Sequence, residues 1–153
     1  MKSLKRILTL FIIFSLTISF IGCSINSKEI DENYVKTTTT SKLEKVFKAI
    51  NDENYINFIS ELDYSMKKNL TSKNFKSMVK NIKDTIGEYQ SAEYESCEEL
   101  DKDYLTVKYK AVFSDEPDET NIVLTVNNNN KDLDICGIYI DSPKMSKSYS
   151  KKK

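Results

Sequence analysis

The side chains that most often carry out enzyme chemistry are scarce in this sequence. It contains no histidine, and its three cysteines, Cys23, Cys97 and Cys136, lack the CxxC spacing of a redox motif or a zinc site. Without histidine there is no Ser-His-Asp or Cys-His nucleophile system and no imidazole ligand for zinc. We therefore predict no catalytic residue, no metal and no cofactor of the common kinds.

Two acidic segments, residues 93–103 and 115–119, are the remaining candidates for metal ligands. Carboxylates bind calcium, but neither segment has the D-x-[DN]-x-[DN]-G loop with a distant glutamate that an EF-hand uses. We interpret both segments as solvent-exposed ends of β-hairpins.

The N-terminus is organised like a secretion signal. Residues 1–6 carry three positive charges and no acid, and the apolar stretch 7–21 follows directly. This stretch is shorter than the roughly 20 apolar residues of a membrane-spanning helix, and serine and threonine dilute it. We therefore predict a signal peptide over residues 1–22 that is removed.

The end of this signal resembles the lipobox of bacterial lipoproteins. In Phe20-Ile-Gly-Cys23 a small residue precedes a cysteine, as in the lipobox, although Phe20 stands where leucine is usual. The resemblance implies that the Cys23 sulfur accepts a diacylglyceryl group and anchors the protein outside the cytoplasmic membrane. An ordinary signal peptide that contains a cysteine is the alternative.

The charge balance after the signal is mildly acidic, because three of the 23 basic residues, including the only arginine, lie within residues 1–6. Nucleic-acid binding calls for a basic surface with clustered arginine, so we exclude that class of partner. A cell-wall component or a surface protein is the kind of partner left for a domain outside the membrane.

Two terminal segments show no apolar periodicity. Residues 23–40, with the run Thr37 to Thr40, are predicted to be a flexible tether with a reach of roughly 25 Å. Residues 143–153, which contain five lysines, are predicted to be a disordered tail. The folded domain is expected to span residues 41–142.

The first half of this domain has the 3.6-residue period of helices. Ser41 can cap a helix over residues 42–50, and two shorter pieces are expected at 55–62 and 63–70. Thr71 can cap a further helix with the apolar stripe Phe75, Met78, Val79, Ile82 and Ile86. Gly87 suits the stop after it, because glycine accepts a positive φ.

After Gly87 the apolar period changes to two, which indicates strands. They are expected at residues 88–98, 105–113, 122–126 and 133–139, joined by short turns. The fold class is therefore α+β: N-terminal helices packed on a curved four-stranded antiparallel meander. Cys97 and Cys136 would lie on the first and last strands, roughly 14 Å apart, so we predict that they stay unpaired.

This order of elements resembles the NTF2-like, cystatin-like cone. More narrowly, residues 47–142 resemble the DUF3887-type domain of secreted proteins and lipoproteins of Gram-positive bacteria, a family of unknown function. The matching segments are 47–55, 66–71, 86–89, 109–113 and 135–138, which consist mostly of packing and capping residues. None is a catalytic signature, so the resemblance implies a fold rather than a function.

Cones of the NTF2-like type can enclose a pocket, and some that are similar to ketosteroid isomerase use an aspartate base with a tyrosine donor. By that resemblance Tyr55, Asp63, Tyr109 and Tyr139 are the candidates for a ligand pocket. Inward tyrosines more often fill space with the hydroxyl at a rim, and Asp63 is better placed to cap a helix than to act as a base.

Two classes of function remain. In the first, the domain is a noncatalytic binding or interaction module held at the cell surface. In the second, it is a small pocket enzyme of isomerase or hydrolase type that uses aspartate and tyrosine. A deep cavity with a bonded Tyr–Asp pair would favour the enzyme, and a filled cone would favour the module.

Overall fold

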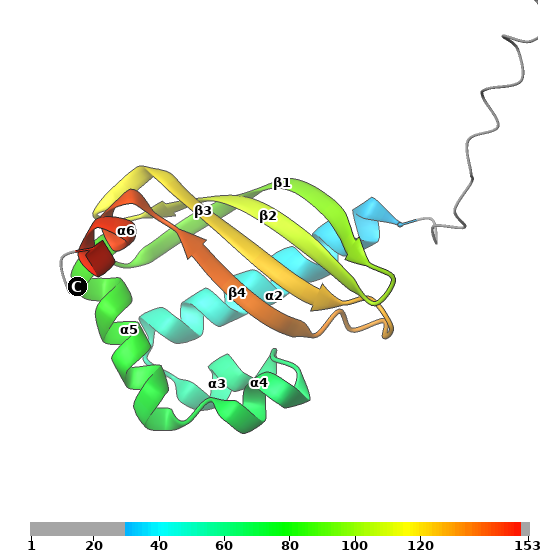
Figure 1. Cartoon of the computed structure of the whole chain (residues 1–153), viewed down its shortest axis with the longest axis horizontal. Helices are drawn as coiled ribbons and strands as arrows, with labels where there is room; N and C mark the ends of the chain where they lie inside the picture. Colours follow the sequence, from blue (N-terminus) through cyan, green and yellow to red (C-terminus); the bar gives the residue numbers. More distant parts are fainter. Residues whose placement is uncertain (1–29, 151–153) are drawn as a thin grey trace, which may run out of the picture.

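The structure is a computed structural model, and it describes residues 30–150 of the chain. Helices come first, strands follow, and a last helix closes the chain, as Figure 1 shows: α2 (Glu32–Asn51), α3 (Tyr55–Ser60), α4 (Tyr64–Asn69), α5 (Ser72–Ile86), β1 (Tyr89–Asp101), β2 (Tyr104–Phe113), β3 (Glu116–Asn127), β4 (Ile135–Asp141) and α6 (Pro143–Ser150). No helix in the described part of the chain is long and apolar enough to cross a membrane.

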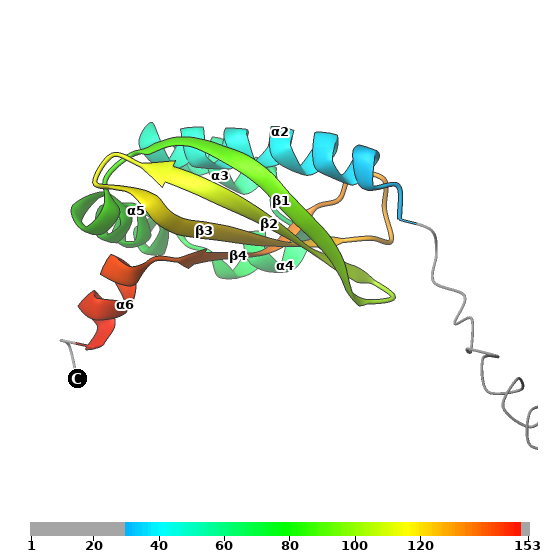
Figure 2. The same cartoon turned by 90° about the horizontal axis from the view of Figure 1, so that it is seen from above.

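The four strands form one open sheet in the order β1-β2-β3-β4, with every neighbouring pair antiparallel. Helix α2 runs along one face of this sheet, as Figure 2 shows. The predicted α+β class and the meander order are therefore confirmed. The two edge strands are β1 and β4, and at the β4 edge Ile135 forms a parallel bridge with Leu62.

The core forms where α2 meets β2. Alternate residues of β2, from Leu105 to Phe113, are buried, and the apolar stripe of α2 from Leu43 to Ile50 is buried as well. Phe47 contacts the rings of Tyr89 and Phe113 at centroid distances of 4.8 and 6.0 Å. Burial of such side chains contributes about 1.5–3 kcal/mol each, so this contact holds the helix on the sheet.

Helix α5 begins and ends where its capping residues predict. The Thr71 hydroxyl accepts a hydrogen bond from the Asn74 backbone N–H at 3.2 Å. Gly87 follows with φ of +84°, a conformation that side chains with a Cβ rarely adopt. The chain then turns directly into β1.

The predicted tether is wrong from residue 32 onward, because α2 begins at Glu32 with Asp31 as its N-cap. Val35 and Thr39 are buried on the same face of the helix as Leu43. The Thr39 hydroxyl donates to the Val35 carbonyl at 2.7 Å and lies 2.6 Å from the Tyr109 hydroxyl. A search for apolar periodicity overlooks a buried position that a hydrogen-bonded threonine fills.

The predicted disordered tail is also wrong over residues 143–150, which form α6. The buried carboxylate of Glu116 accepts hydrogen bonds from the Ser142 hydroxyl and, at 3.0 Å, from the Lys144 backbone N–H. Ser142 accepts from the Met145 backbone N–H at 3.1 Å, and Met145 packs into the core. Glu116 therefore attaches the last helix to β3.

A β-bulge changes the face of the sheet on which each later side chain of β4 lies. Ile135 pairs with Val126 and Gly137 pairs with Thr125, so Cys136 is an extra residue in β4. Beyond the bulge Ile138 and Ile140 face the core side, opposite Leu124 and Ile122. The even-numbered residues are therefore inward there, where simple alternation from Ile135 predicts the odd-numbered ones.

Candidate functional site

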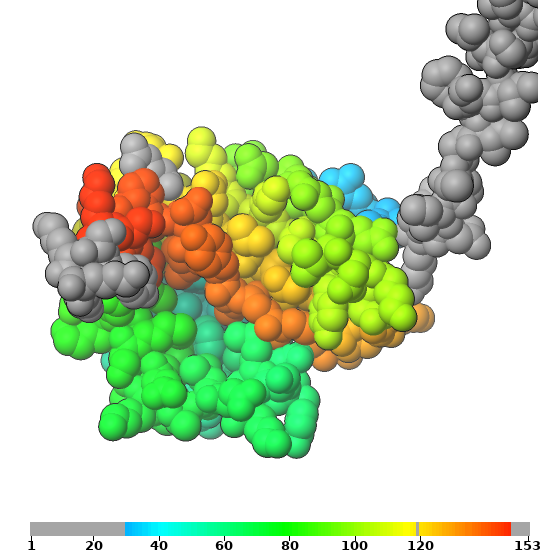
Figure 3. All heavy atoms as spheres, in the orientation of Figure 1, coloured from blue at the N-terminus to red at the C-terminus, as the bar shows by residue number. Residues whose placement is uncertain are grey.

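A groove of about 610 Å³ lies between the helices and the β4 edge of the sheet. In Figure 3 it is the hollow between the green atoms of α5 and the orange atoms of β4. Every element except the first three strands contributes to its lining: Ile50, Phe58, Met66, Leu70, Ser77, Met78, Asn81, Ile82, Ile138, Tyr139, Ile140 and Met145.

The bulge and α6 together produce this groove. Because Cys136 shifts the alternation of β4, Ile138 and Ile140 point toward the helices and form one wall. Helices α4 and α5 line the side opposite β4, and Met145 of α6 adds to the lining. Deep inside lie Ile50 and Phe58, which belong to the main core.

The lining of the groove is apolar and carries no charged side chain. Three of its residues, Met66, Met78 and Met145, have flexible and polarisable side chains that adapt to ligands of different shape. Ser77, Asn81 and Tyr139 supply the only side-chain polar atoms. Such a site can hold an uncharged apolar group, and it offers no acid or base for proton transfer.

Tyr109, predicted to face inward, is fully buried at the middle of β2. Its hydroxyl bonds to Thr39 at 2.6 Å and to Thr40 at 3.3 Å, and its ring packs edge-on against Tyr94. Burial raises the pKa of Tyr109, although the two threonine bonds lower it. The residue therefore joins α2 to the sheet, and it does not line the groove.

Asp63 caps a helix, as predicted. Its carboxylate accepts from the Met66 backbone N–H at 2.7 Å at the start of α4. Its own backbone N–H donates to the Ile135 carbonyl at 2.8 Å, and the Ile135 N–H donates to Glu61 at 3.2 Å. These two bonds place residues 61–63 along the first residue of the β4 edge.

Cys136 is a reactive side chain close enough to Asp63 to feel its charge, a juxtaposition that no local sequence pattern predicts. Burial first, and then the negative charge and hydrogen bond of Asp63, raise the pKa of Cys136 to about 11. A thiol with so high a pKa is a weak nucleophile near neutral pH. The pair therefore does not form an activated cysteine.

The two other tyrosines take different positions. Tyr55 is partly buried, and its hydroxyl donates to the Leu70 carbonyl at 2.6 Å, which fastens the end of α4. The inward position predicted for Tyr139 is wrong, because the β4 bulge turns it to the outer face, where it is 62% exposed. It reaches the rim of the groove from there.

The four candidate residues thus do not converge on one pocket. Only Tyr139 touches the groove, and no hydrogen bond joins Asp63 to any of the three tyrosines among the interactions of residues 30–150. The alternating Ile138 and Ile140 were the sequence signal for the groove wall, since they break the odd-numbered pattern of Leu133 and Ile135. Cys23 lies outside the described residues.

The described side chains of the two acidic segments do not form a metal centre. Across residues 30–150 no three histidine, cysteine, aspartate or glutamate side chains are placed to hold a metal ion together. Glu116, from the second segment, is instead used to hold α6. Both cysteines of the described range, Cys97 and Cys136, are free.

Comparison with known proteins gives a family and little else. A family profile described as "Protein of unknown function (DUF3887)" matches residues 44–135 of the chain. No curated protein and no solved structure matches it. The matched range runs from α2 to the first residue of β4, so it includes most of the fold and part of the groove.

Proposed function

This chain belongs to the DUF3887 family of proteins of unknown function, so we propose its role from the groove alone. The protein is a binding module that holds an apolar ligand without chemical turnover. It is anchored by lipid outside the cytoplasmic membrane. The observation that carries the proposal is the groove of about 610 Å³, which has apolar walls and no charged lining residue. A surface-protein segment or a wall-associated molecule with an exposed apolar part has the chemistry to occupy it.

The lipid anchor is the part of the proposal that rests on residues 1–23. A basic segment, an apolar stretch and Gly22-Cys23 occur in the order of a lipoprotein signal. Two acyl chains on Cys23 give stable anchoring, since each buried CH₂ contributes about 0.8 kcal/mol. Cys23→Ala is expected to leave the protein unprocessed or to release it from the membrane fraction, and normal maturation of this variant would refute the anchor.

The groove is tested with an uncharged fluorescent probe such as N-phenyl-1-naphthylamine. We expect saturable binding by the wild-type protein, with affinity lowered at least about tenfold by Met78→Gln, which places an amide in the apolar wall. Leu100→Gln is the matched control, because Leu100 is 60% exposed outside the groove. Equal binding by both variants would refute the groove as the site.

The alternative is the pocket enzyme of isomerase or hydrolase type. It needs Asp63 as a base beside a tyrosine hydroxyl, whereas Asp63 caps α4 and Tyr109 bonds to threonines. Assays with ester, phosphate, glycoside and enolisable ketone substrates compare the wild type with Asp63→Asn and Tyr109→Phe. Turnover that either substitution abolishes would replace the binding module with the enzyme.

A further inference from the structure

We propose that the outer surface of α3, α4 and α5 is a second contact with the membrane, which lays the domain on its side against anionic phospholipid. We call this surface the lysine face and define it by its exposed residues: Ile56, Tyr64, Lys67, Lys68, Lys73, Lys76 and Lys80. In Figure 1 the three helices lie together below the sheet, on the side of β4. The proposal goes beyond the groove and rests on the lipid anchor proposed above.

The positive charges of this face are largely uncompensated. Lys67, Lys68, Lys73 and Lys76 are exposed and form no ion pair with any residue in the range 30–150. Lys80, the fifth lysine, pairs with Asp84 at 2.6 Å. Four free ammonium groups on two adjacent helices attract a negatively charged surface.

The acids of this part of the chain do not cancel this charge, and Asp84, the one acid within the three helices, is paired with Lys80. Between residues 55 and 83 the only acids are Glu61 and Asp63. The Glu61 side chain is 14% exposed and lies within 3.5 Å of the ammonium groups of Lys42 and Lys45. Asp63 is used as the cap of α4. The exposed surface from α3 to the middle of α5 is therefore positive.

Two exposed apolar side chains favour lipid over a purely polar polyanion. Tyr64, at the start of α4, is 79% exposed, and Ile56 in α3 is 67% exposed. An amphipathic tyrosine and an aliphatic side chain beside lysines are typical of surfaces that enter the headgroup region of a bilayer. A water-soluble wall polymer would gain nothing from them.

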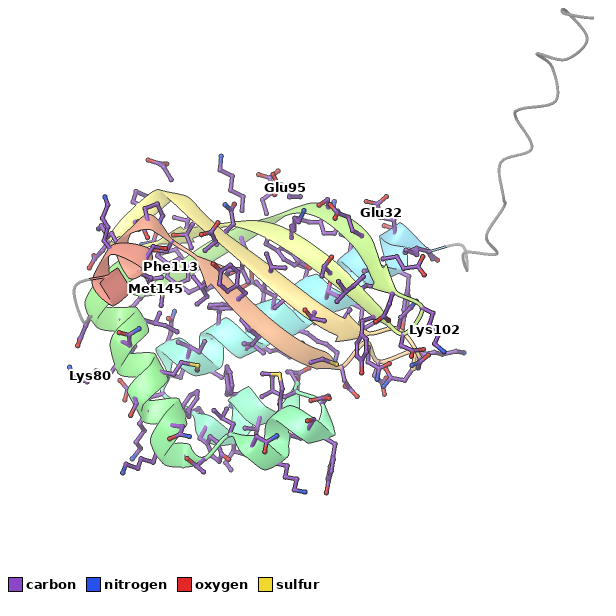
Figure 4. All side chains as sticks on the ribbon, in the orientation of Figure 1. Glu32, Lys80, Glu95, Lys102, Phe113 and Met145 are labelled. Atoms are coloured by element: carbon purple, nitrogen blue, oxygen red, sulfur yellow. The ribbon has the colours of Figure 1, made fainter. Side chains whose placement is uncertain are left out.

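The opposite edge of the molecule carries the opposite charge. The exposed residues of β1 include Glu93, Glu95, Glu98, Glu99 and Asp101. Strand β1 is the edge strand farthest from β4 in the sheet. The segment just before α4 lies at the β4 edge, because Leu62 pairs with Ile135 there. Figure 4 labels Glu95 on the upper edge and Lys80 on the lower side. An anionic bilayer thus attracts one side and repels the other.

The length of the chain between Cys23 and Ile30 permits this orientation. Seven residues reach at most about 25 Å when fully extended. Helix α2 then runs about 30 Å along the sheet. If α2 were perpendicular to the bilayer, most of the lysine face would lie farther from the lipid headgroups than the Debye length of about 8–10 Å. A domain lying on its side brings the anchor and the lysine face to the same bilayer.

Single tryptophans report the orientation, because the chain contains no native tryptophan. Two variants of the mature lipidated protein are prepared. One carries Tyr64→Trp on the lysine face and the other carries Leu100→Trp on β1, where Leu100 is 60% exposed. Each variant is placed in phosphatidylcholine vesicles with or without phosphatidylglycerol. We expect a blue shift and quenching by brominated lipid for Tyr64→Trp only, and only with phosphatidylglycerol. At about 1 M salt, where the Debye length is about 3 Å, both effects should vanish.

Charge-matched variants test the lysines. Replacement of Lys67, Lys68, Lys73 and Lys76 by glutamine should weaken association of the tethered domain with the anionic surface, read by the Tyr64→Trp signal, by about fivefold per lysine. The control replaces Lys48, Lys102, Lys110 and Lys131, which are exposed elsewhere, and should keep the Tyr64→Trp signal. Equal loss in both sets, or equal response of both reporters, would refute the lysine face.

Two further results separate this proposal from others. Loss of the Tyr64→Trp blue shift on anionic vesicles when soluble poly(glycerol phosphate) is added at equal phosphate would overturn the lipid assignment and favour a wall polymer. Failure to float with neutral vesicles at high salt would contradict the lipid anchor instead. Partition of that protein onto anionic vesicles would then still test the lysine face.

Discussion

The hydroxyl groups of Thr39 and Tyr109 lie 2.6 Å apart in the buried core, and they join the first half of α2 to the middle of β2. The two residues are 70 positions apart in the chain. Thr39 also donates to the Val35 carbonyl at 2.7 Å, so Tyr109 is the donor to Thr39. This bond, together with the buried Val35, holds the N-terminal half of α2 on the sheet.

A double-mutant cycle measures this bond. Tyr109→Phe leaves Thr39 bonded to Val35 and should lower the free energy of unfolding by about 1 kcal/mol, whereas Thr39→Val leaves a buried tyrosine hydroxyl poorly paired and should cost about 2 kcal/mol. Because both remove the same bond, the double variant should lose less than the sum of the two. Urea unfolding followed by circular dichroism gives the three values, and strict additivity would contradict the bond.

Gly87→Ala should destabilise the protein by more than about 1 kcal/mol. Gly87 has φ of +84°, and an added Cβ would lie 1.9 Å from the Ser114 hydroxyl oxygen. Gly137→Ala is the control, since its Cβ would contact Thr125 at 3.4 Å without a positive φ. Thermal unfolding should show a much lower Tm for the first variant; similar values for both would argue against the predicted strain.

Glu116→Ala should release α6 from the sheet. The substitution removes the acceptor of the Ser142 hydroxyl and the Lys144 N–H, and loss of a partner for buried donors costs about 1–3 kcal/mol each. Hydrogen exchange should show faster exchange of the α6 amides, while the core of β2 keeps its protection. Asp118→Ala, at an exposed residue of the same strand, should leave α6 protected.

Cys136 should react slowly with alkylating reagents below about pH 11. Burial and the Asp63 charge disfavour the thiolate, so its fraction and the alkylation rate should rise as the pH rises through that value. Asp63→Asn keeps a capping side chain but removes the charge, so the Cys136 profile should move to lower pH. Mass spectrometry of the modified peptides reads the rate at pH values where the protein stays folded, and an unchanged profile would show that Asp63 does not act on the thiol.

Cys97 and Cys136 should remain unpaired in the isolated protein. Their strands, β1 and β4, lie at opposite edges of the sheet, farther apart than a disulfide allows. Intact mass without reducing agent should therefore equal the mass after reduction. A mass lower by two hydrogens, restored by reduction, would contradict the strand order.

Local patterns in the sequence were sufficient for most elements. The stripe from Phe75 to Ile86 and the stop at Gly87 define α5 because helix period and capping depend on residues within a few turns. The alternation from Leu105 to Phe113 defines β2 for the same reason, since the pleat has a period of two. The α+β order follows from the change of period at Gly87.

Tertiary structure alone decided which polar residues are buried. Thr39 and Glu116 are polar and look like surface residues in the sequence, yet both are buried. Thr39 bonds to Tyr109 of β2, far along the chain. Glu116 accepts hydrogen bonds from Ser142 and Lys144 near the C-terminus. Hydrogen bonds between segments far apart in the chain offset the cost of burial, and no local periodicity reports them. For that reason the predicted domain, residues 41–142, began too late and ended too early, since α2 starts at Glu32 and α6 ends at Ser150.

The groove depended on pairing as well. On each side of Cys136 the residues of β4 alternate between the two faces of the sheet. The bulge that separates the two stretches is set by the register of β4 against Val126 and Thr125 of β3. One inserted residue exchanges the two faces of all following residues in a strand. Tyr139 therefore points outward, and Ile138 and Ile140 point toward the helices. The sequence by itself determined the elements and their order, whereas register and long-range hydrogen bonds decided which side chains meet, because both arise only when the segments pack together.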